Sequence, residues 1–187
     1  RYICEHTKKK HVVLAPTGIA AINAGGVTIH YFFQVPFAPY VPESSFSADG
    51  KATYRFRYGK EKINIIRSID LLVIDEISMV RADLLDSVDA VLRRFRDRNK
   101  PFGGVQLLMI GDLQQLSPVV KDDEWQMLCK YYDTPYFFSS QALKQTEYCT
   151  IELKKVYRQN DGTFLELLNR IRENRCDGQV LEALNRR

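Results

Sequence analysis

Apolar runs of strand length alternate along the chain with longer segments in which apolar residues recur at helical spacing. Each run is bounded by polar residues, glycine or proline, as expected where a strand leaves a sheet. This alternation is typical of a parallel sheet covered by helices on both faces. The pattern predicts five short strands, over residues 12–15, 71–75, 105–110, 136–138 and 148–153.

The strongest helical pattern covers residues 81–98, with acidic residues early and arginines late, an order that suits the helix dipole. A second helix is expected after Asp161, whose carboxylate suits an N-cap. Shorter helices are predicted over residues 17–24, after Pro16, and over 179–187. The helix over 81–98 has apolar positions at Leu84, Leu85, Val88, Val91, Leu92 and Phe95.

Residues 34–62 interrupt this alternation with three prolines, several serines and an alternating aromatic and basic stretch over 54–58. Such alternation is typical of one strand of a hairpin. We interpret the segment as a small inserted β-hairpin subdomain, with residues 1–33 and 63–187 forming the main α/β domain. The alternative is an aromatic-rich hairpin that covers the edge of the sheet.

The composition of the 187 residues is that of an ordinary globular protein, with 45% hydrophobic residues, 27% charged residues and a net charge of +4. This charge allows a nucleic acid as partner without requiring one. The four cysteines are scattered without zinc-site spacing, which favours reduced, buried thiols in a cytoplasmic protein. No apolar run is long enough for a membrane span, and we expect neither export nor membrane insertion.

Asp75 and Glu76 directly follow the predicted strand 71–75. Ligands of open α/β sheets bind at the carboxyl ends of the strands, where these two carboxylates would lie. In phosphate-hydrolysing enzymes one acid holds Mg²⁺ and a second deprotonates the attacking water. The alternative is that the pair only ends the strand and caps the next turn.

The next predicted strand ends in Gly111-Asp112-Leu113-Gln114-Gln115-Leu116-Ser117-Pro118 and delivers further polar groups to the same edge. Gln115 could there hydrogen-bond a terminal phosphate. Arg158 follows the last predicted strand and could stabilise the charge on a phosphoryl group in transfer. The alternatives are an ordinary turn for the first segment and a solvated surface arginine for the second.

Four blocks in order resemble the PIF family of 5′-to-3′ DNA helicases, relatives of RecD, over nearly the whole chain. They are Ala15-Pro16-Thr17-Gly18-Ile19-Ala20-Ala21 with Gly25 to Phe33, then Val73 to Val80, Gly111 to Leu116, and Tyr157-Arg158-Gln159. The resemblance implies a RecA-like P-loop NTPase fold, with ATP and Mg²⁺ as cofactors. It also implies that Asp75 holds Mg²⁺, Glu76 is the general base, Gln115 senses the terminal phosphate, and Arg158 stabilises the transition state.

The first block implies a grip on single-stranded DNA. The resemblance assigns this role to Pro16, Thr17, Gly18, Thr28, His30 and Phe33. Thr17 and Gly18 would offer a hydroxyl and backbone donors to a phosphate, while His30 and Phe33 would lie on the base side. The alternative is that His30 and one of the two neighbouring phenylalanines belong to the core. In these helicases an insertion placed like residues 34–62 helps to split the duplex.

The chain also departs from the family's pattern. Ser117-Pro118 replaces the usual Pro-Pro, and no Gly-x-x-x-x-Gly-Lys-Ser/Thr loop occurs in the 187 residues. The family carries that loop and its strand upstream, and a second RecA-like domain downstream. We therefore expect a sheet with a gap where that strand would lie, and a chain that alone does not hydrolyse ATP.

The resemblance implies an ATP-dependent helicase that acts on single-stranded, forked or duplex DNA, in an intracellular, bacterial-type nucleoid setting. It associates the protein with DNA repair, recombination and telomere maintenance. Two alternatives stay open, namely a non-catalytic module that binds single-stranded nucleic acid, and another P-loop enzyme such as a nucleotide kinase or an ATPase that acts on protein.

Overall fold

A four-stranded parallel sheet forms the centre of the structure, a computed structural model that describes residues 5–41, 58–153, 155, 157 and 161–186. The strand order is β2-β1-β3-β4, and the register places Val13 opposite Val73 and Val73 opposite Leu108. Three of the predicted strands are confirmed, and β2 is too short to give a pattern in the sequence. The bounds are His11–Ala15 for β1, Val27–Thr28 for β2, Leu71–Ile74 for β3 and Gln106–Met109 for β4.

β3 lies between two partners, and all four of its residues are buried, as expected for a central strand with both faces covered. β4 instead alternates between exposed and half-buried residues, and no described residue pairs with its outer edge. The expected gap is absent among the described strands, because β1, β3 and β4 pair directly with one another. The sheet is therefore open at β4.

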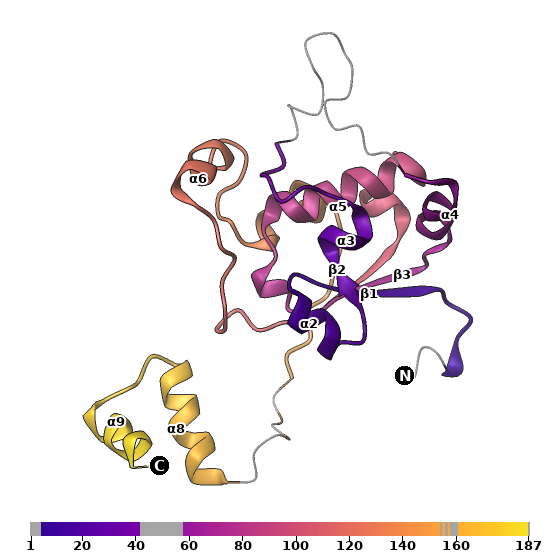
Figure 1. The fold of residues 1–187 in the computed structure, drawn as a ribbon. Helices are drawn as coiled ribbons and strands as arrows, with labels where there is room; N and C mark the ends of the chain where they lie inside the picture. Colours follow the sequence, from indigo (N-terminus) through magenta and orange to yellow (C-terminus); the bar gives the residue numbers. More distant parts are fainter. Residues whose placement is uncertain (1–4, 42–57, 154, 156, 158–160, 187) are drawn as a thin grey trace. The chain divides into compact units, whose positions relative to one another are not determined.

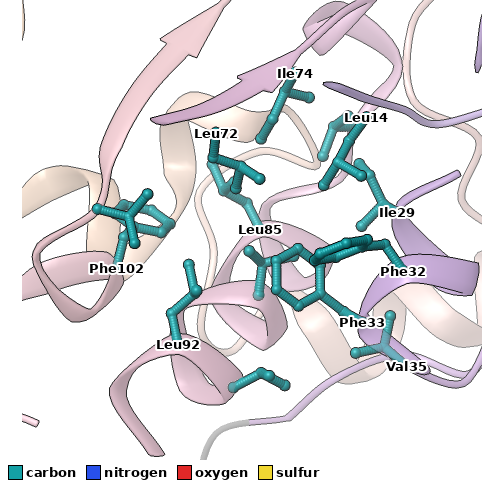
Figure 2. Packing of buried hydrophobic residues seen from close by; sticks show 14 of the residues in the cluster. Leu14, Ile29, Phe32, Phe33, Val35, Leu72, Ile74, Leu85, Leu92 and Phe102 are labelled. Atoms are coloured by element: carbon teal, nitrogen blue, oxygen red, sulfur yellow. The ribbon is translucent and has the colours of Figure 1, made fainter. Parts of the chain in front are cut away.

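The main core lies between the sheet and the helices α3 (Ile29–Phe33), α4 (Lys60–Ser68) and α5 (Ala82–Phe95). Leu85 and Leu92 of α5 are fully buried and pack with side chains of β1, β3 and α3 (Figure 2). Burying one such side chain contributes about 1.5–3 kcal/mol. The helical spacing of α5 thus fixes this helix against the sheet, as the sequence predicted.

The remaining helices surround this core or follow it in the chain (Figure 1). α2 begins after Thr17, α8 after Asp161 and α9 after Asp177, and each of these residues caps its helix through its side-chain oxygen. The predicted helices are thereby confirmed. The bounds are Gly18–Asn23 for α2, Asp122–Leu128 for α6, Gln141–Lys144 for α7, Gly162–Arg172 for α8 and Gly178–Asn185 for α9.

The two other predicted strands are wrong. Residues 136–138 enter the short 3-10 helix η4 (Phe137–Ser139), and only Tyr136 forms a bridge, with Arg81. The Ser139 amide turns back to the Tyr136 carbonyl, and the Ser139 hydroxyl accepts from the Thr134 amide. Residues 148–153 form no strand, because no described strand lies beside them to complete their hydrogen bonds.

Contacts divide the chain into two units, residues 1–147 with the sheet and residues 148–187 with α8 and α9. Of the predicted insertion over 34–62, residues 42–57 with most of the alternating stretch lie outside the described residues, and Lys60–Lys62 begin α4.

The three described cysteines, Cys129, Cys149 and Cys176, are exposed rather than buried. No described helix is both long and apolar enough to cross a membrane.

Gly26 lies where the chain passes closest to β1. A Cβ atom at this position would stand 2.2 Å from the Val13 carbonyl oxygen, and that oxygen cannot move away without disturbing the strand. We expect Gly26→Ala to lower the free energy of unfolding by about 1–3 kcal/mol, measured by urea denaturation. Gly18→Ala, where an added Cβ meets nothing within 4 Å, is the control and should change it by less than about 0.5 kcal/mol.

Candidate active site at the strand ends

Backbone hydrogen bonds hold the carboxyl ends of three strands together. The Asp75 amide donates to the Leu14 carbonyl at 2.8 Å, and the Ile110 amide donates to the Ile74 carbonyl at 2.9 Å. The Ile77 amide closes the series by donating to the Ile110 carbonyl at 2.9 Å. The segments that follow β1, β3 and β4 therefore start from one edge of the sheet.

The acid pair, Asp75 and Glu76, lies on a strained turn directly after β3. Glu76 has a left-handed backbone, with φ 52° and ψ 45°, and the 3-10 helix η2 (Ile77–Met79) follows it. The Glu76 amide donates to Asp75 Oδ1 at 3.0 Å, and both acids are half-buried. A left-handed backbone at a residue other than glycine costs about 1–3 kcal/mol and is concentrated at functional sites. The turn thus presents two carboxylates in a fixed arrangement.

The segment after β4 lies directly against this turn. A Cβ at Gly111 would stand 2.9 Å from Ile77 Cγ2 and 3.0 Å from the Ile77 nitrogen, so glycine permits the close approach. Asp112 organises the residues that follow, since its carboxylate accepts from the Gln114 amide at 3.0 Å and from Gln115 Nε2 at 3.1 Å. The Gln115 side chain is exposed and held by Asp112.

The donor set of this edge suits a magnesium ion bound together with a phosphate. Among the described residues, no three His, Cys, Asp or Glu side chains gather as a complete metal site. Mg²⁺ does not require such a cage, because it keeps several water ligands and commonly takes one or two carboxylates plus phosphate oxygens. Asp75 and Glu76 are carboxylates of this kind, next to each other at the end of the central strand.

The threonines predicted to contact DNA both cap short helices. Thr17 Oγ1 accepts from the Ala20 amide and Thr28 Oγ1 accepts from the Tyr31 amide, each at 3.3 Å. Pro16, Thr17 and His30 line one cavity of about 230 Å³, which the structure places beside the end of β1. Gly18 is exposed at the start of α2.

Phe33 is a correction to the predicted DNA-binding set. Its side chain is fully buried and packs edge to face against Phe32, with ring centroids 5.0 Å apart, so it cannot reach a DNA base (Figure 2). Phe37 is an exposed aromatic of this region, and its ring stacks on His30 with centroids 4.3 Å apart and an interplanar angle of 17°. Sequence reasoning missed Phe37 because its place next to His30 depends on the path of the chain after α3.

A charged network that the sequence did not reveal forms another wall of the cavity. Arg81 donates to both carboxylate oxygens of Asp83, at 2.8 and 2.7 Å, and to Glu124 at 3.0 Å. Burial lowers the pKa of the His30 imidazole, and the nearby Arg81 lowers it further, while Asp83 acts in the opposite direction. Burial and Arg81 thus both favour the uncharged imidazole.

Arg158 and Gln159 of the fourth block lie outside the described residues, and Tyr157 before them is exposed. The structure therefore brings Asp75, Glu76 and the Asp112–Gln115 segment to one edge, with Thr17 following the neighbouring strand. The role of Arg158 stays a prediction.

Comparison with known protein families matches residues 2–180 to the family described as PIF1-like helicase. The chain belongs to this family. It is 40% identical over 180 residues to the human ATP-dependent DNA helicase PIF1, which covers 92% of this chain and 24% of the human protein. It is 34% identical to the ATP-dependent DNA helicase RRM3 of Saccharomyces cerevisiae, over 88% of this chain and 21% of that protein.

Solved structures of the family have the same fold. A structure of the Pif1 helicase from Bacteroides in complex with ADP-AlF3 and ssDNA matches with a TM-score of 0.89 and 41% identity, over 97% of this chain and 40% of that one. The Pif1 helicase from Candida albicans matches with a TM-score of 0.69 and 31% identity, over 92% and 36%. The likeness confirms the RecA-like α/β fold. The chain spans 24% of the length of human PIF1 and 21% of the length of yeast RRM3.

The left-handed backbone of Glu76 gives a stability test of the site. Glycine adopts this conformation without strain, whereas alanine does not, so Glu76→Gly should be more stable than Glu76→Ala by about 1 kcal/mol. The measurement is urea denaturation of both variants and of the wild type. Equal stability of the two variants would mean that the turn at Glu76 is not strained.

Proposed function

We propose that this chain is part of the first motor domain of an ATP-dependent DNA helicase that couples ATP hydrolysis to 5′-to-3′ movement along single-stranded DNA and to unwinding. One observation carries the proposal. The acid pair follows β3, and the residues of the first block follow the neighbouring strand β1, so that both start from the same edge of the sheet. When the terminal phosphate is bound or lost, a movement of the residues that hold it can therefore be passed to the DNA contact through a short stretch of rigid backbone.

In this proposal Mg·ATP, when bound, supplies the phosphoanhydride bond that is cleaved and the cation that balances its charge. Asp75 holds Mg²⁺ through its carboxylate, and Glu76 accepts a proton from the attacking water. The Gln115 amide, held by Asp112, hydrogen-bonds the terminal phosphate. Arg158 stabilises the charge that develops during transfer.

On the DNA side, the Thr17 hydroxyl donates to a backbone phosphate while its oxygen accepts from the Ala20 amide. Pro16, Gly18 and Thr28 shape the path of the strand, and His30 lies on the base side. Relatives support DNA as the partner, since a structure of Bacteroides Pif1 is bound to ssDNA and a second structure concerns unwinding at forked dsDNA by two coordinating Pif1 helicases. The partners we propose for this chain are single-stranded and forked DNA.

The unpaired outer edge of β4 is where we expect a further strand of the sheet to pair. In RecA-like domains the strand that leads into the phosphate loop lies inside the sheet, and the described sheet offers an unpaired edge at β4. We propose that this strand pairs there, and that a second RecA-like domain completes the motor. We further propose that the protein is intracellular and acts in DNA repair, recombination or telomere maintenance. We also propose that the insertion over residues 34–62 helps to separate the duplex.

The catalytic half of the proposal is tested in a full-length helicase that carries this sequence. Glu76→Gln keeps the size and hydrogen bonding of the side chain but removes the base, so DNA-stimulated ATP hydrolysis should fall by about 10²–10⁴-fold. Binding to single-stranded DNA, measured by fluorescence anisotropy, should stay unchanged. Glu166→Gln, the same exchange at an exposed residue of α8, serves as the matched control. ATP hydrolysis that survives in Glu76→Gln would remove Glu76 from catalysis.

A further inference from the structure

Basic side chains lie at the edge of the sheet opposite the acid pair. Because the strands are parallel, β1, β3 and β4 all begin at this edge, which we call the amino edge and define as residues 5–10, 67–70 and 96–106. β3 has four residues, and a strand of that length spans roughly 13 Å, so the amino edge is separate from the site proposed above. No residue of the amino edge has a part in the proposed function.

The positive charge of the chain is concentrated at the amino edge. Seven basic and three acidic residues lie there, and this surplus equals the net charge of the whole chain, +4. The rest of the sequence is therefore neutral in sum. The basic residues of the amino edge are Lys8, Lys9, Lys10, Arg67, Arg96, Arg98 and Lys100.

Hydrogen bonds between the three segments bring these residues onto one surface. The Lys10 amide donates to Asp70 Oδ2 at 2.9 Å, and the Asp70 amide donates back to the Lys10 carbonyl at 2.8 Å. The Gln106 amide donates to the Asp70 carbonyl at 3.2 Å, and Gln106 Oε1 accepts from Lys9 Nζ at 2.7 Å. A neutral amide holds this ammonium group, so the charge of Lys9 is not cancelled.

Two of the arginines serve the fold. Arg96 donates to the Ile66 carbonyl at 3.3 Å, and Arg67 Nε donates to the Phe95 carbonyl at 3.3 Å. These bonds satisfy carbonyls that α4 and α5 leave unpaired at their ends. Both arginines thus have a structural reason to lie at this edge, and they carry no part of the inference.

The side chains of Lys8, Lys10 and Arg98 have no such structural role. All three are exposed, and within the part of the chain that the structure describes none of them donates a hydrogen bond or forms an ion pair. Lys100 is also exposed and lies 3.6 Å from a carboxylate oxygen of Asp97, a surface contact that contributes little. Cations left in this way favour an anionic partner, because its charge removes their mutual repulsion.

The amino edge lacks the aromatic surface on which single strands stack. Phe102 is the only Phe, Tyr or Trp of its three segments, and that side chain is fully buried. Single strands gain affinity by stacking bases on exposed rings, whereas a duplex keeps its bases stacked and presents one phosphate charge per about 1.7 Å of its axis. Exposed lysines and an arginine without a ring therefore fit the backbone of a duplex.

We propose that the amino edge binds the phosphate backbone of duplex DNA, as a second DNA surface of this domain. The inference rests on the function proposed above, since it assumes a protein that works on forked DNA. Lys8, Lys10 and Arg98 contact phosphates, and Lys9, held by Gln106, adds a further positive charge. These contacts read no base sequence, because the backbone phosphates carry none.

The test uses a full-length helicase that carries this sequence and a blunt duplex of about 20 base pairs without a single-stranded tail. Fluorescence anisotropy gives the affinity over a range of salt concentrations. In the triple variant Lys8→Gln, Lys10→Gln and Arg98→Gln, the slope of log K against log salt should become shallower by about 2–3, because each phosphate contact contributes about 0.9. The slope for single-stranded oligo-dT should stay at the wild-type value.

A matched variant removes the same charges outside the amino edge. Lys130→Gln, Lys144→Gln and Arg186→Gln together also remove two lysines and one arginine, all exposed, and this variant should bind the duplex like the wild type. A third variant, with lysine exchanged for arginine and arginine for lysine at the three amino-edge positions, keeps the charge and should keep the slope. Because all exchanged side chains are exposed, each variant should unfold at the urea concentration of the wild type.

The outcomes separate this inference from the proposed function. A duplex slope that stays at the wild-type value in the amino-edge variant, while oligo-dT still binds, would overturn the duplex surface and leave the proposed function standing. An equal change for duplex and oligo-dT, or an equal change in the matched variant, would also overturn it, since the effect would then not be specific to a duplex at this edge. A wild-type helicase that binds neither ligand would overturn both the inference and the DNA-binding half of the proposed function.

Discussion

The hydrogen bonds that join the ends of β1, β3 and β4 are the constraint on which the rest of the structure depends. They run from the Asp75 amide to Leu14, from the Ile110 amide to Ile74, and from the Ile77 amide to Ile110. Each bond lies just beyond the paired residues of a strand, so it extends the order of the sheet into the segments that carry the polar groups. Without these bonds, the acid pair and the Asp112–Gln115 segment would be separate surface loops.

Local interactions hold the polar side chains at this edge of the sheet in place. Glu76 takes a strained backbone, Gly111 allows two segments to come into contact, and Asp112 holds Gln115. The Arg81–Asp83 pair connects the segment after β3 to the cavity wall that carries Phe37. Hydrolysis and DNA binding, as proposed, would thus share one rigid frame.

The sequence predicted those parts of the fold whose signal is local. The helical period over residues 81–98, the apolar run before Asp75, the segment 17–24 after Pro16 and the cap at Asp161 each predicted an element that the structure confirms. The strand predicted over 148–153 was wrong, because a strand also requires a partner, and periodicity carries no information about partners. Phe33 and Phe37 could not be told apart from sequence, since burial depends on how the chain turns after α3. The Arg81–Glu124 ion pair joins residues 43 positions apart, and no local pattern could predict it.

Amide hydrogen exchange at the strand ends tests the account most directly. The amides of Asp75, Ile77 and Ile110 lie at or just beyond the ends of their strands, where fraying would ordinarily give fast exchange. If the strand ends are joined as described, these three amides should exchange about as slowly as those of the centre of β3, with the free energy of global unfolding. Exchange of these amides at the rate of an open loop, while the centre of β3 stays protected, would contradict the account.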